Sequence, residues 1–564
     1  MGRTVAIGLQ DFSDVIEKNI FYVDKTDFIK RWWDQNDAVT LITRPRRFGK
    51  TLTMSMVERF FSVKYAGMPN VFQNLKIWND ERYHKIQGTY PVIFLSFAKV
   101  KDTTYTEASK NICKIISDTY KEHEYILCNG TLSEDDKTMF RKHSNELAEN
   151  EAKDAISDLA RLMYKCYGKK AIILLDEYDT PMQEAYVNGY WQEIVNFLRS
   201  LFNSTFKTNP YIERGILTGI TRVSKESIFS DLNNLAVVTT ISDKYADCFG
   251  FTESEVKSAL NEQGVGDFEA VKKWYDGFIF GSIKDIYNPW SVISYLQSGN
   301  LEAYWANSSS NTLVSKLVRE GEPELKEKME LLCAGKSIWS EIDEQIVYNQ
   351  LDLGEVAIFS LLVASGYLKI ISRDDSNVAD LAVEPLYELA LTNLEVLSMF
   401  RKLFSDWFAN TPIKEGRFVT ALFNQDIKML NIYMNDIAVS TFSSFDVGVA
   451  PSQRAPERFY HGFVLGLMAE TVRNYVLTSN RESGYGRYDV MMEPRNKSDK
   501  AVIIEFKVFD EETEKSLEDT LTAALKQIED KKYDQTLIDR GIHADNILKY
   551  GFVFQGKKVL IGAK

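Results

Sequence analysis

The fold is decided by the stretch Val39-Thr40-Leu41-Ile42-Thr43-Arg44-Pro45-Arg46-Arg47-Phe48-Gly49-Lys50-Thr51. Its first five residues are apolar or β-branched, which is typical of a buried strand. The apolar residues that follow recur at helical spacing, at Leu52, Met56, Phe60 and Phe61. The stretch therefore predicts a strand, an arginine-rich loop and an amphipathic helix.

The loop matches the end of the phosphate-binding pattern G-x-x-x-x-G-K-S/T. In that pattern, backbone amides at the helix start cradle phosphate, the lysine reaches its outer oxygens, and the hydroxyl residue binds Mg²⁺. Gly49, Lys50 and Thr51 fit, whereas Arg44 stands where the first glycine is expected. Either the loop tolerates Arg44 or nucleotide binding is weakened. We expect ATP and Mg²⁺ here, with Arg44 and Arg47 among the residues next to the nucleotide.

A second apolar strand, residues 171–175, ends in Asp176-Glu177. An Asp at this place can hold Mg²⁺ and a following Glu can activate water. Alone, the pattern is more typical of a strand that ends at a polar turn, but the upstream Gly-Lys-Thr favours the functional interpretation. A third strand, residues 215–220, carries Thr218 and precedes Arg222. Both are candidates for sensing the terminal phosphate, although each alone is more typical of a turn residue or a solvated charge.

Another apolar run at residues 91–97 and helical patterns at 112–120 and 191–202 separate these strands. Strands that alternate with helices predict a parallel sheet covered on both faces. Ligands of such sheets bind at the carboxyl ends of the strands, where this loop would lie. The first part of the chain is therefore expected to be an α/β nucleotide-binding domain.

Near the other end of the chain, residues 502–508 predict a buried strand that contains Glu505 and Lys507. Strand side chains alternate, so these two charges share one face, and burying them is costly without partners. Asp489 lies on an earlier short strand, 488–492, and a turn with Pro494, Asn496 and Ser498 would fold it back beside Glu505. Mg²⁺ held by Asp489 and Glu505 is the predicted partner, and Lys507 would orient or deprotonate a water. A bare E-x-K triplet is more often an ordinary surface ion pair.

Two amphipathic helices flank this region. The first begins at Pro456 and has an apolar stripe at Phe459, Phe463 and Leu467; the second has one at Leu517, Leu521, Leu525 and Ile528. Gln527 and Lys531 lie four apart on the second helix, hence on one face. His461 and Glu470 on the first helix are weaker candidates for the site.

Several segments together resemble a known family: residues 21–26 (Phe-Tyr-Val-Asp-Lys-Thr), 44–51, 175–179 (Leu-Asp-Glu-Tyr-Asp), 274–277 with 287–291, and 486–489 with 504–507. The chain is similar over nearly its whole length to bacterial AAA-ATPase-like proteins that carry a C-terminal PD-(D/E)XK nuclease domain. The resemblance implies an ATPase module coupled to a nuclease, makes Arg44 a family trait, and implies metal-binding acids and a water-serving lysine at Asp489, Glu505 and Lys507. It also implies that a polar helix residue approaches the site, which makes Gln527 a candidate, although a solvated helix face explains this residue more easily.

Length and charge limit the remaining possibilities. A chain of 564 residues is expected to form two to four domains. A net charge of −13 excludes a surface that is basic all over, so any grip on nucleic acid must be a local, salt-sensitive patch. The five cysteines lack C-x-x-C spacing, which argues against zinc and favours thiols in a reducing compartment. Neither a signal peptide nor a membrane span is indicated, so a cytoplasmic location is expected.

The middle of the chain is expected to be mainly helical. Its aromatic residues Trp274, Tyr275, Tyr287, Trp290 and Trp305 could stack bases, but are more typical of the core of a small helical lid. Residues 361–370 predict a helix, a glycine and a strand, as in a winged helix that either touches DNA or braces the ATPase. Pro412 and Gly416 mark a joint. The expected domains are a P-loop domain (1–245), a helical lid with a winged-helix-like part (246–410) and a nuclease-like domain (411–564).

The sequence therefore favours a Mg²⁺-dependent nuclease, with DNA preferred over RNA, that is gated by ATP binding or hydrolysis. A nucleotide-dependent switch that binds protein or nucleic acid through an inactive nuclease site is the alternative. A third hypothesis is a nuclease whose ATPase fold is merely structural. Homo-oligomer formation stays open.

Overall fold

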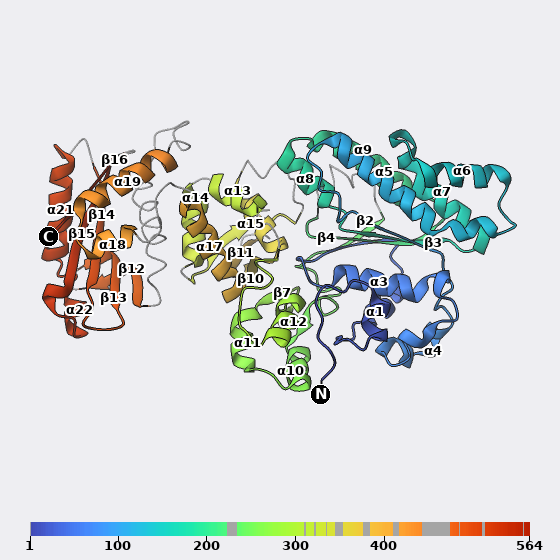
Figure 1. The fold of residues 1–564 in the computed structure, drawn as a ribbon, viewed down its shortest axis with the longest axis horizontal. Coiled ribbons are helices and arrows are strands. Elements are labelled where there is room, and N and C mark those ends of the chain that lie inside the picture. The colour runs from blue at the N-terminus through green and yellow to red at the C-terminus, as the bar shows by residue number, and fades with distance from the viewer. Residues whose placement is uncertain are drawn as a thin grey trace. The chain divides into compact units, whose positions relative to one another are not determined.

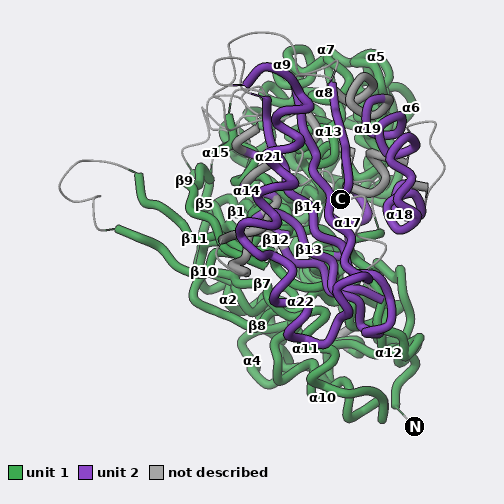
Figure 2. The backbone as a smooth tube through the Cα atoms, turned by 90° about the vertical axis from the view of Figure 1, so that its left-hand side faces the viewer, with its two compact units in different colours: residues 1–320, 335–397 green, residues 321–334, 398–564 purple. Residues whose placement is uncertain are grey.

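The computed structural model of the chain describes residues 2–222, 234–308, 312–320, 323–333, 335–344, 354–375, 384–409, 417–442, 474–483, 486–509, 514–555 and 558–564. The chain divides into two compact units, shown in Figure 2. Unit 1 comprises residues 1–320 and 335–397, and unit 2 comprises residues 321–334 and 398–564.

Unit 1 is built on a parallel sheet of five strands in the order β2-β3-β4-β1-β5. The strands are β1 (Val39–Thr43), β2 (Val92–Ser96), β3 (Ala171–Asp176), β4 (Ile212–Gly219) and β5 (Leu235–Val238). Every residue of β1 and β3 is buried, as expected for strands that are covered on both faces. The predicted parallel sheet is confirmed, and β4 separates the strand before the phosphate loop from the strand that ends in Asp176.

Helices cover both faces of this sheet, as Figure 1 shows. On one side lie α5 (Tyr105–Glu122), α7 (Glu149–Tyr167) and α9 (Trp191–Phe202), with α6 (Glu134–Asn145) and α8 (Thr180–Asn188) next to them. On the other side lie α1 (Phe12–Glu17), α3 (Lys50–Phe61) and α4 (Glu81–His84). Met54, Val57 and Phe60 of α3 pack in one core with sheet residues Ile42 and Leu174.

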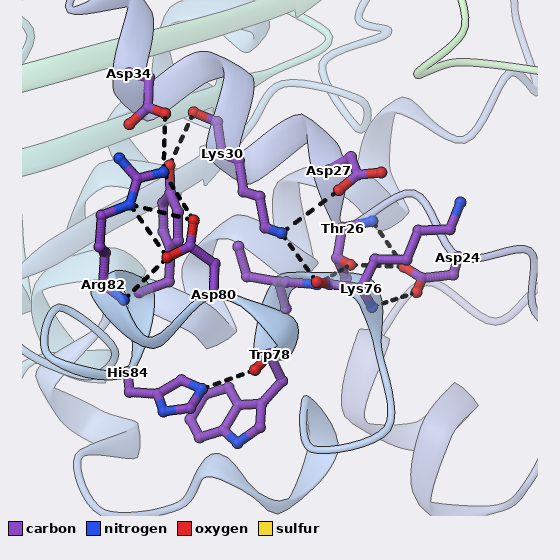
Figure 3. Close-up of polar contacts among 12 residues, drawn as sticks. Asp24, Thr26, Asp27, Lys30, Asp34, Lys76, Trp78, Asp80, Arg82 and His84 are labelled. Atoms are coloured by element: carbon purple, nitrogen blue, oxygen red, sulfur yellow. Dashed lines mark hydrogen bonds and ion pairs between the residues drawn. The ribbon is translucent and has the colours of Figure 1, made fainter.

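A polar network, drawn in Figure 3, fastens the segment before β1 to this layer. Asp24 accepts hydrogen bonds from the Thr26 hydroxyl (Oγ1 to Oδ1, 2.6 Å) and from the Lys76 amide (2.7 Å). The Ile77 amide donates to Thr26 Oγ1 at 3.1 Å. These bonds fix the start of α2 (Asp27–Gln35), whose Trp32 is completely buried.

The rest of unit 1 contains more strand than the sequence predicts. The structure has two small antiparallel sheets, of order β6-β8-β7 and β10-β11-β9, besides helices. The elements are β6 (Phe251–Thr252), α10 (Glu253–Gln263), α11 (Phe268–Tyr275), β7 (Phe278–Phe280), β8 (Ile283–Tyr287), α12 (Pro289–Ser298), α13 (Thr312–Glu320), β9 (Ile338–Glu341), α15 (Glu355–Ala364), β10 (Leu368–Asp374) and β11 (Leu386–Leu391). The expectation of a mainly helical region included the start of β10 but missed the other strands. Strands β6 and β7 have only two and three residues, too few for a recognisable alternation.

The predicted helix, glycine and strand at residues 361–370 are the end of α15, Gly366 and the start of β10. Most of α15 is buried, including Phe359, Leu361 and Leu362. A helix that reads a DNA groove must present a solvent-accessible face. The burial of α15 therefore favours a bracing role over DNA contact.

Unit 2 contains a mixed sheet in the order β12-β13-β14-β15-β16. The strands are β12 (Tyr475–Ser483), β13 (Gly486–Pro494), β14 (Ala501–Val508), β15 (Ile547–Gln555) and β16 (Lys558–Ala563). Only β14 and β15 pair in parallel, and they are joined through α21 (Leu517–Asp530) and α22 (Gln535–Asp539). Helices α18 (Arg417–Phe423) and α19 (Ile427–Phe442) contribute to the core on the other face. Helix α14 (Pro323–Cys333) also belongs to unit 2, whereas α17 (Leu394–Ala409) begins in unit 1 and continues into unit 2.

Some predictions lie outside the described residues: the joint at 410–416, the helix from Pro456, and His461 and Glu470. The boundaries of the three expected domains stay predictions. Among the described residues, no helix is long and apolar enough to cross a membrane.

Candidate active sites

The phosphate loop joins β1 to α3. Gly49 caps α3 with a left-handed backbone (φ 80°), a conformation that glycine adopts without strain. Lys50 begins the helix, and its side chain is 3% exposed. Its Nζ donates to the carbonyl oxygens of Arg44 (3.0 Å) and Pro45 (3.2 Å) and lies 3.5 Å from Glu177 Oε1. The amine is thus directed into the loop, as the predicted phosphate role requires.

Thr51, Asp176 and Thr218 meet next to this amine. Thr51 Oγ1 donates to Asp176 Oδ2 at 2.7 Å, and Thr218 Oγ1 donates to Asp176 Oδ1. Because β4 lies between β1 and β3, Thr218 reaches the carboxylate from the middle of the sheet. Burial of Asp176 and the adjacent Glu177 carboxylate raise the pKa of Asp176. A buried carboxylate between two hydroxyl groups offers the hard oxygen ligands that Mg²⁺ prefers.

Glu177 follows directly and has a left-handed backbone, with φ 52°. A residue other than glycine in this region costs roughly 1–3 kcal/mol, and such strain clusters at functional sites. The strained backbone supports the predicted role of Glu177 at the carboxyl end of β3.

Asp179 is a residue to which the sequence assigned no role. It is completely buried, and its Oδ2 accepts the Ile220 amide (3.0 Å), the Thr221 amide (2.9 Å) and the Thr221 hydroxyl (2.9 Å). Burial, with a contribution from Glu177, raises its pKa. Asp179 therefore fixes the turn after β4 that follows Thr218. Its position in the motif Asp-Glu-Tyr-Asp was the available signal.

The arginines occupy different surroundings. Arg44 is completely buried, and its Nη1 donates to the carbonyl oxygens of Thr43 (2.8 Å) and Thr239 (2.7 Å). Burial lowers the pKa of Arg44 to about 10. This placement supports a role in holding the loop rather than a direct contact with phosphate. Arg222, three residues after β4, has its Nη1 3.9 Å from Glu344 Oε2.

In unit 2, strand β14 alternates as predicted. Val502, Ile504 and Phe506 enter the core shared with α18 and α19, whereas Ile503 enters the core on the α21 side. Glu505 has the parity of Ile503 and is 3% exposed. Pairing of Val490 with Ile504 brings Asp489 beside Glu505, and Asp489 Oδ2 accepts the Phe506 amide at 2.7 Å. The structure thus brings the two predicted metal-binding carboxylates together.

Helix α21 and the turn that follows it add two polar groups to this site. Gln527 Nε2 donates to Glu505 Oε1 and lies 3.1 Å from the Tyr533 hydroxyl oxygen. Tyr533 is buried, and burial raises its pKa, to which the charges of Glu505 and Asp489 also contribute. Tyr533 was not predicted, since a lone tyrosine after a helix carries no sequence signal. Gln527 lies where the prediction places it.

The donor set fits a divalent metal ion of the Mg²⁺ type. Within the described ranges, no group of three or more His, Cys, Asp or Glu side chains is arranged to hold a metal. Mg²⁺ commonly uses one or two carboxylates and completes its shell with waters and phosphate, so Asp489 and Glu505 suffice. Lys507, half-buried, lies two residues further along β14 and hence on the face of Glu505.

Comparison with known proteins finds a family match in each unit. Residues 6–229 match a family described as predicted AAA-ATPase, and residues 455–564 match the PD-(D/E)XK nuclease superfamily. A protein of Azotobacter chroococcum mcd 1, named "Uncharacterized protein in vnfD 5'region", is 25% identical over 402 residues, which are 70% of this chain and 68% of that protein. The chain thus carries an AAA-ATPase-like region and a PD-(D/E)XK nuclease superfamily region, and this pairing is that of an enzyme.

Proposed function

We propose that the chain is a Mg²⁺-dependent nuclease that acts on DNA and is gated by ATP at the N-terminal phosphate loop. The observation that carries the proposal is the meeting of Asp489, Glu505 and Gln527 on the face of β14 that also bears Lys507. DNA rather than RNA, ATP as the nucleotide and a cytoplasmic location are parts of this proposal.

In unit 2, Asp489 and Glu505 would hold Mg²⁺, which supplies charge stabilisation at the scissile phosphate. Gln527 positions the Glu505 carboxylate through its amide. Lys507 would orient a water on the same face by donating a hydrogen bond to it, or would deprotonate that water. The Phe506 amide holds the Asp489 carboxylate where β13 pairs with β14, so the Asp489 and Glu505 carboxylates keep a fixed orientation relative to each other.

In unit 1, Lys50 would exchange its carbonyl partners for phosphate oxygens, while Thr51 and Asp176 would hold Mg²⁺. Glu177 lies at the strand end where it can accept a proton from water. Thr218 keeps Asp176 oriented through its hydroxyl group.

The test is a cleavage assay with the full chain. Supercoiled, linear and single-stranded DNA and an RNA would be incubated with Mg²⁺, Mn²⁺ or EDTA, with and without ATP. We expect metal-dependent cleavage of DNA that Asp489→Ala abolishes and that Lys50→Ala uncouples from ATP. Asp499→Ala, at an exposed position in the turn after β13, is the matched control and should cut normally.

Intact substrates under every condition would refute the nuclease. ATP-dependent DNA binding that persists in Asp489→Ala without cleavage would establish the alternative of a nucleotide-dependent switch. Cleavage that ignores both ATP and Lys50→Ala would leave the ATPase fold with a structural role only.

A further inference from the structure

The phosphate loop is contacted by residues from the part of unit 1 that follows the parallel sheet. The Phe48 ring packs against Phe278 (ring centroids 4.8 Å apart) and Phe280 (5.3 Å). A Cβ at Gly366 would lie 2.8 Å from Pro45 Cγ, so the turn between α15 and β10 packs directly against the loop. These contacts mean that the loop cannot move without affecting its neighbours.

Asn288 connects the loop to the start of α12. It is completely buried, and its Nδ2 donates to the Arg46 carbonyl oxygen at 3.3 Å. Its Oδ1 accepts the amides of Trp290 (2.9 Å) and Ser291 (3.3 Å), which caps the helix. One side chain therefore couples the backbone of the loop to the first turn of α12.

Trp290, in that first turn, holds an arginine of the loop. The Arg47 guanidinium carbon lies 4.2 Å from the Trp290 ring centroid, within the range of a cation–π interaction. Arg47 is exposed and has a left-handed backbone, with φ 66°. A strained residue that persists at a ligand loop requires support from its surroundings, and the ring supplies it.

The other two arginines of the loop have different partners. Arg44 is buried against carbonyl groups, and Arg46 Nη2 donates to Gln183 Oε1 at 3.3 Å. Arg47 is the arginine that stands two residues before Gly49 and rests on an aromatic face. An arginine binds phosphate through charge-assisted, often bidentate hydrogen bonds, which are stronger than contact with a ring at an exposed site.

We propose that Trp290 is the resting partner of Arg47 and that the phosphates of ATP replace it, so that the first turn of α12 registers nucleotide occupancy. The inference rests on ATP binding at the loop, as proposed above. It gives residues 278–298 and the α15–β10 turn the role of reading the nucleotide state. The substitution Trp290→Phe keeps an aromatic ring for Arg47 to rest on, but it removes the indole whose fluorescence reports on Arg47.

The experiment measures tryptophan fluorescence of the full chain while ATP with Mg²⁺ is added, and in parallel ATP binding by equilibrium dialysis. The chain has nine tryptophans, so the signal is assigned by difference. We expect wild type to show an ATP-induced change whose amplitude at saturation falls at least severalfold in both Trp290→Phe and Arg47→Ala. Trp339→Phe, which removes an exposed indole on β9, should keep the full amplitude.

An undiminished change in Trp290→Phe or in Arg47→Ala, with ATP bound, would overturn this inference alone. Lys50→Ala is the control that should bind no ATP in the dialysis experiment. If wild type also binds no ATP, the proposed nucleotide function is refuted instead. Far-ultraviolet circular dichroism of each variant checks that the fold is retained.

Discussion

The side-chain amide of Gln527 donates a hydrogen bond to the Glu505 carboxylate and so ties α21 to β14 at the candidate nuclease site. The same nitrogen lies 3.1 Å from the Tyr533 hydroxyl oxygen, which keeps the amide in place. A group that orients a metal-binding carboxylate without binding the metal itself commonly affects both affinity and activity.

Removal of the Gln527 amide should weaken Mg²⁺ binding and so slow cleavage. We expect Gln527→Ala to lower cleavage about 10- to 100-fold at limiting Mg²⁺ and to recover part of that loss at high Mg²⁺. The measurement is the cleavage rate as a function of Mg²⁺ concentration. Gln535→Ala on α22 removes a comparable glutamine, which bonds to Asp539 at 2.8 Å, and should leave the Mg²⁺ dependence unchanged. An unshifted Mg²⁺ profile in Gln527→Ala would assign Gln527 a packing role only.

The approach of α21 to the sheet depends on small residues on β15 and β16. Gly551, the register partner of Glu505, would place a Cβ 2.7 Å from Leu521 Cδ1 and 3.2 Å from Ala524 Cβ. Because Ala524 Cβ is fixed to the helix backbone, Gly551→Ala should push α21 outward, at a cost of about 1–3 kcal/mol in the free energy of unfolding. Chemical denaturation measures this cost. Gly130→Ala, where a Cβ meets nothing within 4 Å, is the control.

The same substitution should also impair cleavage, since outward movement of α21 withdraws Gln527 from Glu505. A stable Gly551→Ala protein with normal Mg²⁺ dependence would show that the spacing of helix and sheet does not control the site.

The candidate nuclease site was largely predictable because strand alternation alone puts Glu505 and Lys507 on one face and Phe506 on the other. The position of Gln527 could be predicted only from the family resemblance. Its contact with Glu505 requires the close approach of α21 to the sheet that Gly551 and Gly562 permit. Tyr533 was not predictable: its role depends on a turn that no residue pattern marks.

Loss of the Glu177 carboxylate should separate ATP binding from ATP hydrolysis. Lys50 and Thr51 keep their roles in Glu177→Gln, so ATP should still bind, whereas loss of a general base typically slows turnover about 10²- to 10⁴-fold. Phosphate release and equilibrium dialysis measure the two steps. Glu213→Gln is the matched control, because Glu213 lies near the start of β4, at the amino ends of the parallel strands, whereas Glu177 follows the carboxyl end of β3. Normal hydrolysis by Glu177→Gln would remove Glu177 from the chemistry.

Asn431 and Asn435 on α19 occupy the outer edge of β16. Asn431 exchanges two hydrogen bonds with Ile561 (Nδ2 to the carbonyl oxygen and Oδ1 from the amide, each 2.8 Å), and Asn435 bonds in the same way to Val559 at 2.7 and 3.0 Å. The two amides thereby replace a neighbouring strand and protect the sheet edge.

Loss of either amide should therefore destabilise unit 2. With a net value of about 0.5–1.5 kcal/mol per hydrogen bond, Asn431→Leu should cost roughly 1–3 kcal/mol in the free energy of unfolding. Asn431→Asp keeps the acceptor for the Ile561 amide but sets a carboxylate oxygen against the Ile561 carbonyl oxygen, so it should also be less stable than wild type. Denaturant titration compares the variants, and light scattering tests whether the bared edge promotes association. Equal stability of Asn431→Leu and wild type would contradict the edge-protecting role.

In unit 1, the motif fixed the positions of Lys50, Thr51 and Asp176 because strand, loop and helix are local in sequence. The partner of Asp176 on β4 depends on sheet order, which places β4 between β1 and β3 and which no local pattern reveals. The buried place of Arg44 was equally hidden, since its carbonyl partner at Thr239 lies almost 200 residues away.

Glu395, at the start of α17, gives unit 1 a stability that depends on pH. Its buried carboxylate accepts the Ser291 hydroxyl (2.9 Å) and the Trp305 amide (2.6 Å), but burial outweighs these bonds and raises its pKa to about 7. Between its unfolded pKa, about 4.5, and about 7, the folded state therefore binds more protons than the unfolded state. Linkage then makes the free energy of unfolding fall as pH rises through this window.

Glu395→Gln should remove this part of the pH dependence, because the amide cannot ionise and can still accept the Trp305 N–H bond. Relative to wild type, the variant should gain roughly 2–4 kcal/mol in the free energy of unfolding as pH rises from about 4.5 to above 7. Denaturant titration at several pH values measures the two slopes. Glu388→Gln on β11 is the control: the Glu388 carboxylate has a lowered pKa through its bonds to Ser337 and Ser372, so it titrates below this window and the wild-type slope should remain. Parallel slopes for wild type and Glu395→Gln would mean that Glu395 ionises at the same pH in the folded and unfolded states.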